Sequence, residues 1–246
     1  MKKLICLTMA AILVLSAASC KKEVRYKKYG IDGVTPLPEA IDIGTVVNGK
    51  VVKWGSFNLG ASKVGEYGDY YAWGETEPKD CYTWETYSFA SEFTKITKYC
   101  PKYCEESYWV FEARPEGADG IIEMLPEDNA VLKKLGGKWR MPNHDDVLAL
   151  LDLKKDPDCK WEYSEQGLRI TRISTGKSLL FPPAGCYKEK PETGNHCGFW
   201  IDWICSSNPS LGQDIYIMID LQRAGYLDHD GDNRYLGLPI RPVYEE

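Results

Sequence analysis

The sequence predicts an α+β fold, in which antiparallel strands joined by long loops outnumber two helices. Short stretches with alternating apolar residues recur along the chain, and residues 214–221 show the alternation most clearly. Residues 124–135 and 143–151 combine helical spacing with capping residues. Residues 81–120 follow neither period. With 246 residues and 43% hydrophobic composition, the chain can bury one sizeable core without a second domain.

The N-terminus has the features of a bacterial lipoprotein signal peptide, which we place at residues 1–19. Lys2 and Lys3 precede an apolar run over residues 4–15 that is too short to cross a bilayer comfortably. Small residues then lead to Cys20, where we expect cleavage and lipid attachment. The alternative is an ordinary secretory peptide with an incidental cysteine. The lipoprotein interpretation places the protein in the cell envelope, on the outer membrane and exposed at the cell surface. The sequence leaves open whether it faces the periplasm instead.

Residues 20–39 are expected to form the lipidated cysteine and a tether, because they combine glycines and prolines with no apolar periodicity. The folded domain is then expected to cover residues 40–246. The formal net charge of −6 becomes −8 once Lys2 and Lys3 leave with the leader. An acidic chain without a basic stripe argues against nucleic acid as a partner.

The domain is expected to open with a hairpin over residues 41–59. Asn48-Gly49 supplies the two positive-φ positions of a tight type I′ turn. We expect the second strand to continue toward Gly60.

The middle of the chain contains one segment without a pattern and one with clear helix signals. Residues 81–120 are either a functional insertion or contain short elements that no period reveals. A helix is expected over residues 124–135, with Pro126 near its first turn. Gly136-Gly137 is expected to end that helix, because glycine suits a left-handed cap.

A second helix is expected to begin after Asn143, which can cap it. Residues 138–141 are expected to be extended, because Pro142 disfavours helical geometry in the residue before it. In His144-Asp145-Asp146, the carboxylates suit the positive end of a helix. This capping interpretation is favoured over a metal or acid–base cluster.

A second hairpin is expected over residues 164–181, with strands at 168–173 and 178–181 and a stop at the glycine and prolines that follow. Pro239 and Pro242 place the last strand at an edge or break it with a bulge. The remaining expected elements are strands at 200–204 and 214–221, a turn at 228–233 and a last strand near 235–244.

Five ordered motifs resemble a known group of proteins: YGDYYAWGETEPK, GGKWRMPNHDDVLALL, FPPAGC, WICSS and IRPV. They look like the Fibrobacter succinogenes major paralogous domain, a group of exported bacteroidete and fibrobacter proteins. The resemblance covers about residues 40–244. It implies a C-type-lectin-like fold, similar to that of formylglycine-generating enzymes, on exported or surface-anchored proteins. It implies no reaction, since the functions of the group are mostly unknown.

Trp139, Arg140, Pro142 and Arg241 lie in these motifs and look like framework residues. Trp139 is expected to pack in the core, and the two arginines to form internal ion pairs. A buried guanidinium needs a carboxylate partner. The candidate partners, which we leave unranked, are Asp42, Asp69 and Glu75.

Aromatic and short polar residues gather after residue 185, in the C-terminal part of the chain. Aromatic faces with polar neighbours suit stacking on sugars or anchoring a protein partner. The other interpretation assigns the aromatics to the core, which we favour for Trp200 and leave open for Trp203 and the tyrosines. The ligand-binding candidates are Tyr187, Asn195, His196, Trp203, Tyr226, Asp228, Asp230, Asn233 and Tyr235.

Asp228, Asp230 and Asp232 are the best metal candidates, because alternating carboxylates can converge on a hard cation such as calcium. An EF-hand does not fit, since its sixth position is Asn233 instead of glycine and its twelfth is Pro239 instead of an acid. Asp and Gly also suit a hairpin turn, which is the interpretation we favour. We therefore expect no cofactor, with calcium as the alternative.

Seven cysteines remain after the leader and the lipidated Cys20. Disulfides can form in an exported chain, and an odd number leaves at least one cysteine without a partner in the chain. Cys100 and Cys104 favour a local disulfide or two buried thiols over zinc. The pairing stays open among Cys81, Cys100, Cys104, Cys159, Cys186, Cys197 and Cys205.

The sequence supports three hypotheses about function. The first is a lipid-anchored, non-catalytic module at the outer membrane whose C-terminal loops bind a glycan or a protein. The second is a structural or adhesive subunit of a surface assembly, such as a pilus tip. The third is a cysteine-dependent oxidase of the formylglycine-generating type, although Cys197 and Cys205 are spaced more widely than that enzyme's pair. Three histidines and no Gly-x-Ser-x-Gly motif favour a non-enzyme.

Overall fold

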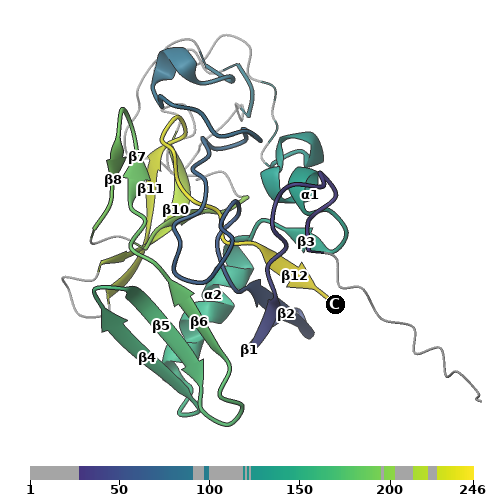
Figure 1. The fold of residues 1–246 in the computed structure, drawn as a ribbon, viewed down its shortest axis with the longest axis vertical. Helices are drawn as coiled ribbons and strands as arrows, with labels where there is room; N and C mark the ends of the chain where they lie inside the picture. Colours follow the sequence, from purple (N-terminus) through teal and green to yellow (C-terminus); the bar gives the residue numbers. More distant parts are fainter. Residues whose placement is uncertain are drawn as a thin grey trace, which may run out of the picture.

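The computed structural model is a mixed α+β structure of mostly antiparallel strands with few helices (Figure 1). The α+β class expected from the sequence is therefore confirmed. The structure describes residues 28–90, 97–99, 119, 121, 123–194, 197–202, 213–220 and 226–246, with 213–220 and 226–232 as backbone only. The expected signal peptide and Cys20 lie outside the described residues.

A four-stranded antiparallel sheet joins the two ends of the described chain. Its strand order is β1-β2-β12-β3, and Figure 1 shows the last strand of the chain between β2 and β3. The four strands are β1 (Ala40–Val47), β2 (Lys50–Gly55), β3 (Trp139–Arg140) and β12 (Val243–Glu245).

The turn between β1 and β2 is the expected one, with φ of 51° at Asn48 and 77° at Gly49. The second strand is shorter than expected and ends at Gly55. The Gly55 N–H donates to the Pro242 carbonyl at 2.8 Å, but proline has no N–H to return the bond. The regular ladder therefore stops there instead of continuing toward Gly60.

The last strand is also shorter than expected, because β12 begins only at Val243, after Pro239 and Pro242. It pairs with a neighbour on each side, so it is not an edge strand. The residues before it cross the interior without regular structure, and Leu238 and Ile240 are each only 2% exposed.

A second sheet has the order β4-β5-β6 and contains the expected second hairpin. Its members are β4 (Cys159–Ser164), β5 (Gly167–Arg172) and β6 (Ser178–Phe181). β4 was not expected, although its half-buried and exposed residues alternate along its length.

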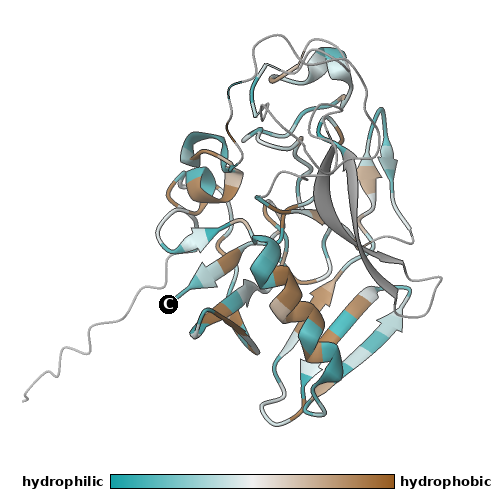
Figure 2. Ribbon diagram, turned by 180° about the vertical axis from the view of Figure 1, so that it is seen from behind, coloured by the Kyte–Doolittle hydropathy of each residue, from teal (hydrophilic) through white to brown (hydrophobic). Residues whose placement is uncertain are grey.

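Helix α2 (His144–Asp152) lies beside this sheet and against β1 (Figure 2). Val147 and Leu150 on its buried face join a core with Trp54, whose ring meets the edges of Phe181 and Phe199 at centroid distances of 6.1 and 5.9 Å. The burial of these large apolar side chains is the main force that holds the helix in place.

The helix expected over residues 124–135 is divided in two. A 3-10 turn over Pro126–Asp128 precedes α1 (Ala130–Lys134). Asn129 interrupts the helix because its backbone is extended and its side chain accepts hydrogen bonds from the N–H groups of Val131 and Leu132. Gly136, with φ of 64°, follows α1 as expected.

The expected cap of α2 is confirmed. The Asn143 side chain accepts from the Asp146 N–H at 2.9 Å, and the Asp146 carboxylate accepts from the Asn143 N–H at 2.7 Å. This reciprocal pair satisfies two donors that a helix start would otherwise leave open.

A third sheet has the order β11-β10-β9. Its strands are β9 (Phe199–Trp200), β10 (Gln213–Asp220) and β11 (Tyr226–Asn233). The turn expected at residues 228–233 is wrong, because all of these residues pair with β10. The pairing of β11 along the whole length of β10 outweighs the local turn preference of Asp and Gly. The strand expected at 200–204 is confirmed at Trp200 but not at Ile201 or Asp202, and residues 203–204 lie outside the described residues.

The first described residues, which we expected to belong to a tether, fold against α1. The Asp32 N–H donates to the Lys134 carbonyl, and Thr35 is only 8% exposed. Backbone hydrogen bonds join Gly30 to Thr35 and Leu37 to Lys28. In Figure 1 this purple segment curls beside α1.

Candidate ligand-binding groove

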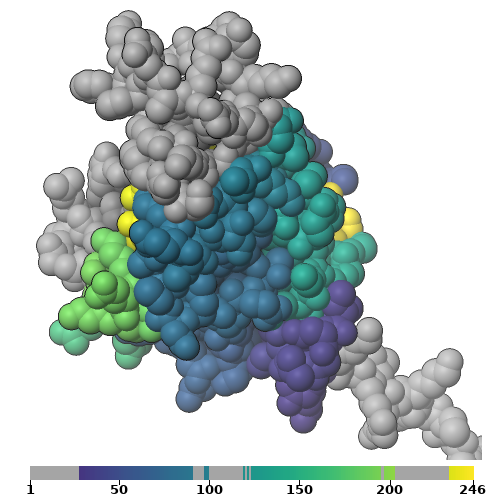
Figure 3. Space-filling view, turned by 90° about the horizontal axis from the view of Figure 1, so that it is seen from above, coloured from purple at the N-terminus to yellow at the C-terminus, as the bar shows by residue number. Residues whose placement is uncertain are grey.

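A hollow of about 340 Å³ opens between the short 3-10 helix η1 (Trp84–Thr86) and the hairpin of β7 (Cys186–Tyr187) and β8 (Pro191–Glu192). Small-molecule sites typically occupy about 300–1,000 Å³. Figure 3 shows the blue segment that contains η1 against the green hairpin. We call this hollow the Trp84 groove, and its lining residues are Tyr82, Thr83, Trp84, Glu85, Lys188, Glu189, Lys190, Glu192 and Tyr235.

The floor of the groove is rigid because its tyrosines are packed and hydrogen-bonded. Tyr82 is 1% exposed, and its hydroxyl donates to the Tyr70 carbonyl. Burial raises the pKa of Tyr82 to about 12. The Tyr187 ring lies 5.2 Å from that of Tyr82 and 5.5 Å from that of Tyr70. A side chain fixed in this way gives a ligand a preformed surface.

Gly237 allows the floor to close. The Tyr187 N–H donates to the Gly237 carbonyl at 2.7 Å, and the Gly237 N–H returns the bond at 2.9 Å. A Cβ atom on Gly237 would lie 2.9 Å from the Tyr82 ring and 3.0 Å from the Tyr187 Cβ. Only glycine fits this approach without displacing one of the two tyrosines.

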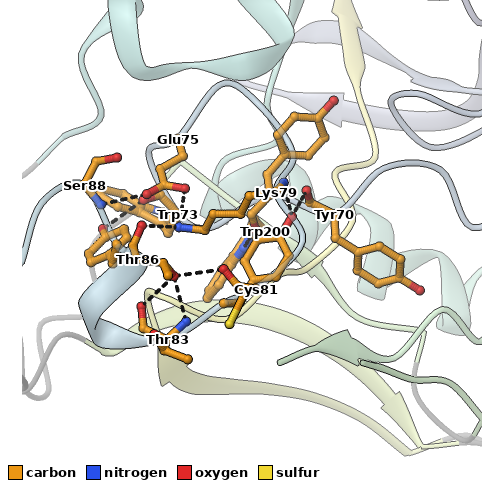
Figure 4. A network of polar contacts seen from close by, with 12 residues as sticks. Tyr70, Trp73, Glu75, Lys79, Cys81, Thr83, Thr86, Ser88 and Trp200 are labelled. Carbon is orange, nitrogen blue, oxygen red and sulfur yellow. Dashed lines mark hydrogen bonds and ion pairs between the residues drawn. The ribbon is translucent and has the colours of Figure 1, made fainter. Parts of the chain in front are cut away.

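A network of polar contacts holds η1 in place (Figure 4). The Lys79 ammonium lies 2.7 Å from the Glu75 carboxylate and donates to the Thr86 carbonyl at 2.8 Å. The Glu75 carboxylate also accepts from the Ser88 N–H at 2.7 Å. The side chains of Lys79 and Glu75 are only 20% and 9% exposed, so this ion pair is largely shielded from water.

The Thr86 hydroxyl contributes a second set of contacts to the same segment. It accepts from the Thr83 N–H at 3.0 Å and donates to the Cys81 carbonyl at 2.8 Å. The backbone on both sides of Trp84 is therefore fixed by side chains that do not line the groove floor.

Trp84 itself is half-buried and stands at an angle to Tyr235. Their ring centroids are 4.8 Å apart and the ring planes meet at 61°. Two aromatic faces set at an angle, with charged groups of both signs around them, can stack on an apolar ligand face and hydrogen-bond its polar rim. Charged side chains that could make such polar contacts line the groove at Glu85, Lys188 and Lys190.

The structure brings two of the expected ligand-binding residues to this place. Tyr235 lines the groove, and Tyr187 packs beneath it. Asn195, His196 and Trp203 lie outside the described residues. The other candidates belong to β11, where Tyr226, Asp228 and Asp230 are described as backbone only and Asn233 ends the strand.

The residues that sequence reasoning missed come from the segment at 81–120 that showed no pattern. Tyr82, Trp84 and Tyr87 lie within six residues, and Thr83 and Thr86 have the spacing of a capping box. This combination of clustered aromatics and a cap was the available signal. Lys188 and Lys190 carried no signal, because charged residues are common in surface turns.

The calcium interpretation depended on a loop through Asp228, Asp230 and Asp232. The backbone of β11 is extended there, and a strand spaces alternate residues by about 6.5 Å along its axis. Within the described part of the chain, no three His, Cys, Asp or Glu residues are grouped so that they could hold a metal.

A second, more polar hollow of about 440 Å³ lies at the start of α2, and Glu123, His144, Asp145 and Asp202 are among its lining residues. Burial raises the pKa of Asp202 to about 7, against the opposing charge of Arg140. The capping interpretation of this region is confirmed at Asp146.

Arg140 pairs with an acid that the sequence reasoning did not consider as its partner. Its guanidinium contacts both carboxylate oxygens of Asp146, at 2.5 and 3.0 Å, and one of Glu245 at 3.4 Å. Asp42, Asp69 and Glu75 were the wrong candidates. The Asp146 side chain is fully buried, so this pair satisfies a charge that would otherwise be costly to bury.

Arg241 is fully buried, and among the described residues its hydrogen-bond partners include no carboxylate. Its guanidinium donates to Asn58 Oδ1 at 2.8 Å and to the carbonyls of Gly55 and Leu180 at 3.1 and 2.8 Å. It also lies 4.4 Å from the centre of the Phe181 ring. The expected ion pair is therefore wrong here, because neutral oxygens and a ring face replace the acid.

The other framework residues occupy interior positions. Trp139 is 6% exposed, with its ring 5.2 Å from that of Tyr244, and the Pro142 carbonyl accepts from the Asp202 N–H at 3.0 Å. Trp200 is fully buried, as expected, and its indole N–H donates to the Tyr71 carbonyl at 2.7 Å.

Among the described cysteines, Cys81, Cys159 and Cys197 carry free thiols, and the Cys186 thiol donates to the Glu192 carboxylate at 3.9 Å. Cys197 therefore forms no disulfide, while Cys100, Cys104 and Cys205 lie outside the described residues. Cys197 is 2% exposed, and burial raises the pKa of its thiol to about 11. A reactive cysteine requires exposure and a lowered pKa, so Cys197 lacks the properties that the oxidase hypothesis needs.

Comparisons with protein-family models, with curated proteins and with solved structures gave no match. Among the described helices, none combines the length and apolar character needed to cross a bilayer.

Proposed function

We propose that this chain is a lipid-anchored, non-catalytic binding protein of the cell envelope, and that it holds a glycan in the Trp84 groove. The observation that carries this proposal is the angled pair of Trp84 and Tyr235 above a rigid tyrosine floor. The lipid anchor rests on the signal-peptide pattern that ends at Cys20.

A glycan fits the groove better than a flat protein surface does. Sugar rings have apolar C–H faces that stack on aromatic rings and hydroxyl rims that bond to charged groups, and the groove offers both kinds of contact. The groove is also preformed, since η1 is held by Glu75, Lys79 and Thr86 instead of by ligand. A preformed site loses little conformational entropy on binding.

We further propose that the fold is C-type-lectin-like. Three features support this: the predominance of antiparallel strands, the sheet that unites the first and last strands, and the stretch of residues 56–83 between β2 and η1, which forms neither helix nor strand. The motif resemblance over residues 40–244 points in the same direction.

Glycan-array screening of the purified protein with and without Trp84→Ala tests the proposal. We expect the wild type to bind one glycan class and Trp84→Ala to bind it about 10- to 100-fold more weakly, because burial of a large apolar side chain against the ligand contributes about 1.5–3 kcal/mol. Tyr67→Ala is the matched control, since Tyr67 is 38% exposed and does not line the groove.

Equal binding by the wild type and Trp84→Ala contradicts the assignment of the groove. If the folded protein binds no glycan and instead crosslinks to neighbouring envelope proteins, the result favours the alternative, a structural or adhesive subunit of a surface assembly.

A further inference from the structure

An exposed apolar loop lies at the start of the described chain. Tyr29, Ile31 and Val34 are 49%, 64% and 74% exposed, and they belong to a single turn of residues 28–37. Three large apolar side chains on one short loop are more than the scattered exposure that is normal for a protein surface. We call this segment the apolar loop.

The apolar loop is rigid and fixed to the domain. Tyr29 and Pro36 form a bridge between the two sides of the turn. The Asp32 carboxylate accepts from the N–H groups of Val34 and Thr35 at 3.0 and 2.9 Å, and the Asp32 N–H donates to α1 through the Lys134 carbonyl. The exposed side chains are therefore displayed on a fixed scaffold, so docking them on a surface would order little additional chain.

The position of the loop in the sequence limits its distance from the anchor. Eight residue steps separate Cys20 from Lys28. A fully extended chain spans at most about 3.3–3.6 Å per residue, so Lys28 stays within about 26–29 Å of the lipidated cysteine. This is about the diameter of a small domain, and the end of the molecule that carries the loop must therefore remain near the bilayer.

Charge favours the same orientation. Residues 21–28 carry five basic side chains and one acid, whereas residues 29–246 carry 23 basic and 35 acidic side chains. An anionic lipid surface attracts the basic neck and repels the acidic body, and the attraction acts over about a Debye length of 10 Å. The strongest electrostatic attraction of the chain to lipid is thus expected at the basic neck, which adjoins the apolar loop.

We propose that the apolar loop rests on an anionic phospholipid surface and sets the orientation of the domain on the membrane. The inference rests on lipid attachment at Cys20, which is part of the proposed function. Tyr29 suits the interface because it combines an apolar ring with a polar hydroxyl. Asp32 at the tip keeps the loop at headgroup depth, since a carboxylate is costly to bury in hydrocarbon.

This orientation leaves the Trp84 groove accessible. Figure 1 shows η1 and the β7–β8 hairpin on the side away from α1 and the apolar loop. A domain seated on the loop would present the groove away from the contact with lipid.

Fluorescence quenching by brominated lipids tests the inference. The full chain is expressed with its leader, and the Cys20-lipidated protein is reconstituted in vesicles of phosphatidylethanolamine and phosphatidylglycerol with brominated acyl chains. We expect about half of the additional fluorescence of Val34→Trp to be quenched. Ile173→Trp is the matched control, because Ile173 is 58% exposed after β5, and we expect no quenching of its added fluorescence.

Each outcome of the quenching experiment supports or contradicts the proposed orientation of the domain. Equal quenching at positions 34 and 173, or quenching at neither, overturns the proposed orientation while the anchor stands. Replacement of phosphatidylglycerol by phosphatidylcholine should reduce the quenching of Val34→Trp, and an unchanged value contradicts the role of anionic lipid. If mass spectrometry finds no acyl groups on Cys20, both the anchor and this inference fail, whereas glycan binding is tested independently by Trp84→Ala.

Discussion

The sites of Arg140 and Arg241 and the Trp84 groove use polar groups in opposite ways. At Arg140 and Arg241, side-chain donors bond to acceptors inside the protein. In the groove, the polar contacts hold the backbone of η1 and the floor tyrosine, while the faces of Trp84 and Tyr235 remain half-exposed. A region whose polar groups are satisfied within the protein acts as scaffold, and a rigid region that holds half-buried aromatic side chains beside a hollow can accept a ligand.

The largest expected effect comes from Arg241→Ala. It leaves Asn58 Oδ1 and two backbone carbonyls buried without their donor, so we expect unfolding free energy to fall by about 3–5 kcal/mol. Urea unfolding followed by circular dichroism measures the change. Arg169→Ala, in a half-buried strand position, is the control and should cost less than about 1 kcal/mol. Similar losses of unfolding free energy in Arg241→Ala and Arg169→Ala would contradict the scaffold role that we assign to Arg241.

The next effect is a pH dependence at Asp202. Burial raises its pKa to about 7 from an ordinary 3.8, so between these values the folded state holds a proton that the unfolded state has released. Stability should therefore fall as pH rises from about 4 to 7, by about 2–4 kcal/mol from this group.

Asp202→Asn isolates that contribution, because it removes the titrating group and leaves the other acids in place. The unfolding free energy of the variant minus that of the wild type should increase as the pH rises. A difference that is constant from pH 4 to 8 contradicts the prediction.

The smallest expected effect on stability comes from Gly237→Ala in the groove floor. The new methyl group displaces Tyr82 or Tyr187, at a cost of about 1–3 kcal/mol. We also expect glycan binding to weaken by more than the loss of stability alone would explain, because the new methyl group moves the floor of the groove. Thermal unfolding and titration of the glycan found by array screening measure the two effects. A loss of stability with unchanged affinity would show that binding does not depend on the floor.

Some elements could be predicted from neighbouring residues alone. The Asn48-Gly49 turn and the Asn143 cap depend on residues within a few positions of each other, and both were found as expected. The short β12 and the extended β11 could not be predicted in this way, because each is decided by its pairing partner. Eight residues of β11 pair with β10, and this long-range pairing outweighs the local turn preference of Asp and Gly.

The same distinction applies to the candidate site, where some residues could be proposed from the sequence and others could not. Tyr187 and Tyr235 could be proposed from their aromatic character, but Trp84 lies far from both in the sequence. The bridge between Tyr187 and Gly237 and the packing of Tyr82 bring these segments together. Side chains that meet only through long-range packing leave no spacing in the chain by which they can be recognised.

The sequence by itself determined the α+β class, the hairpin turn, the glycine after α1 and the capped start of α2, because these depend on backbone preferences over a few residues. Only the tertiary structure decided that Arg140 pairs with Asp146, that Arg241 is satisfied by neutral oxygens and that Trp84 stands against Tyr235. The contacts of Arg241 and the contact of Trp84 with Tyr235 require distant segments to be buried together, whereas Arg140 and Asp146 are six residues apart and meet because the chain turns between β3 and α2. Burial selects partners by shape and by the need to satisfy every polar group.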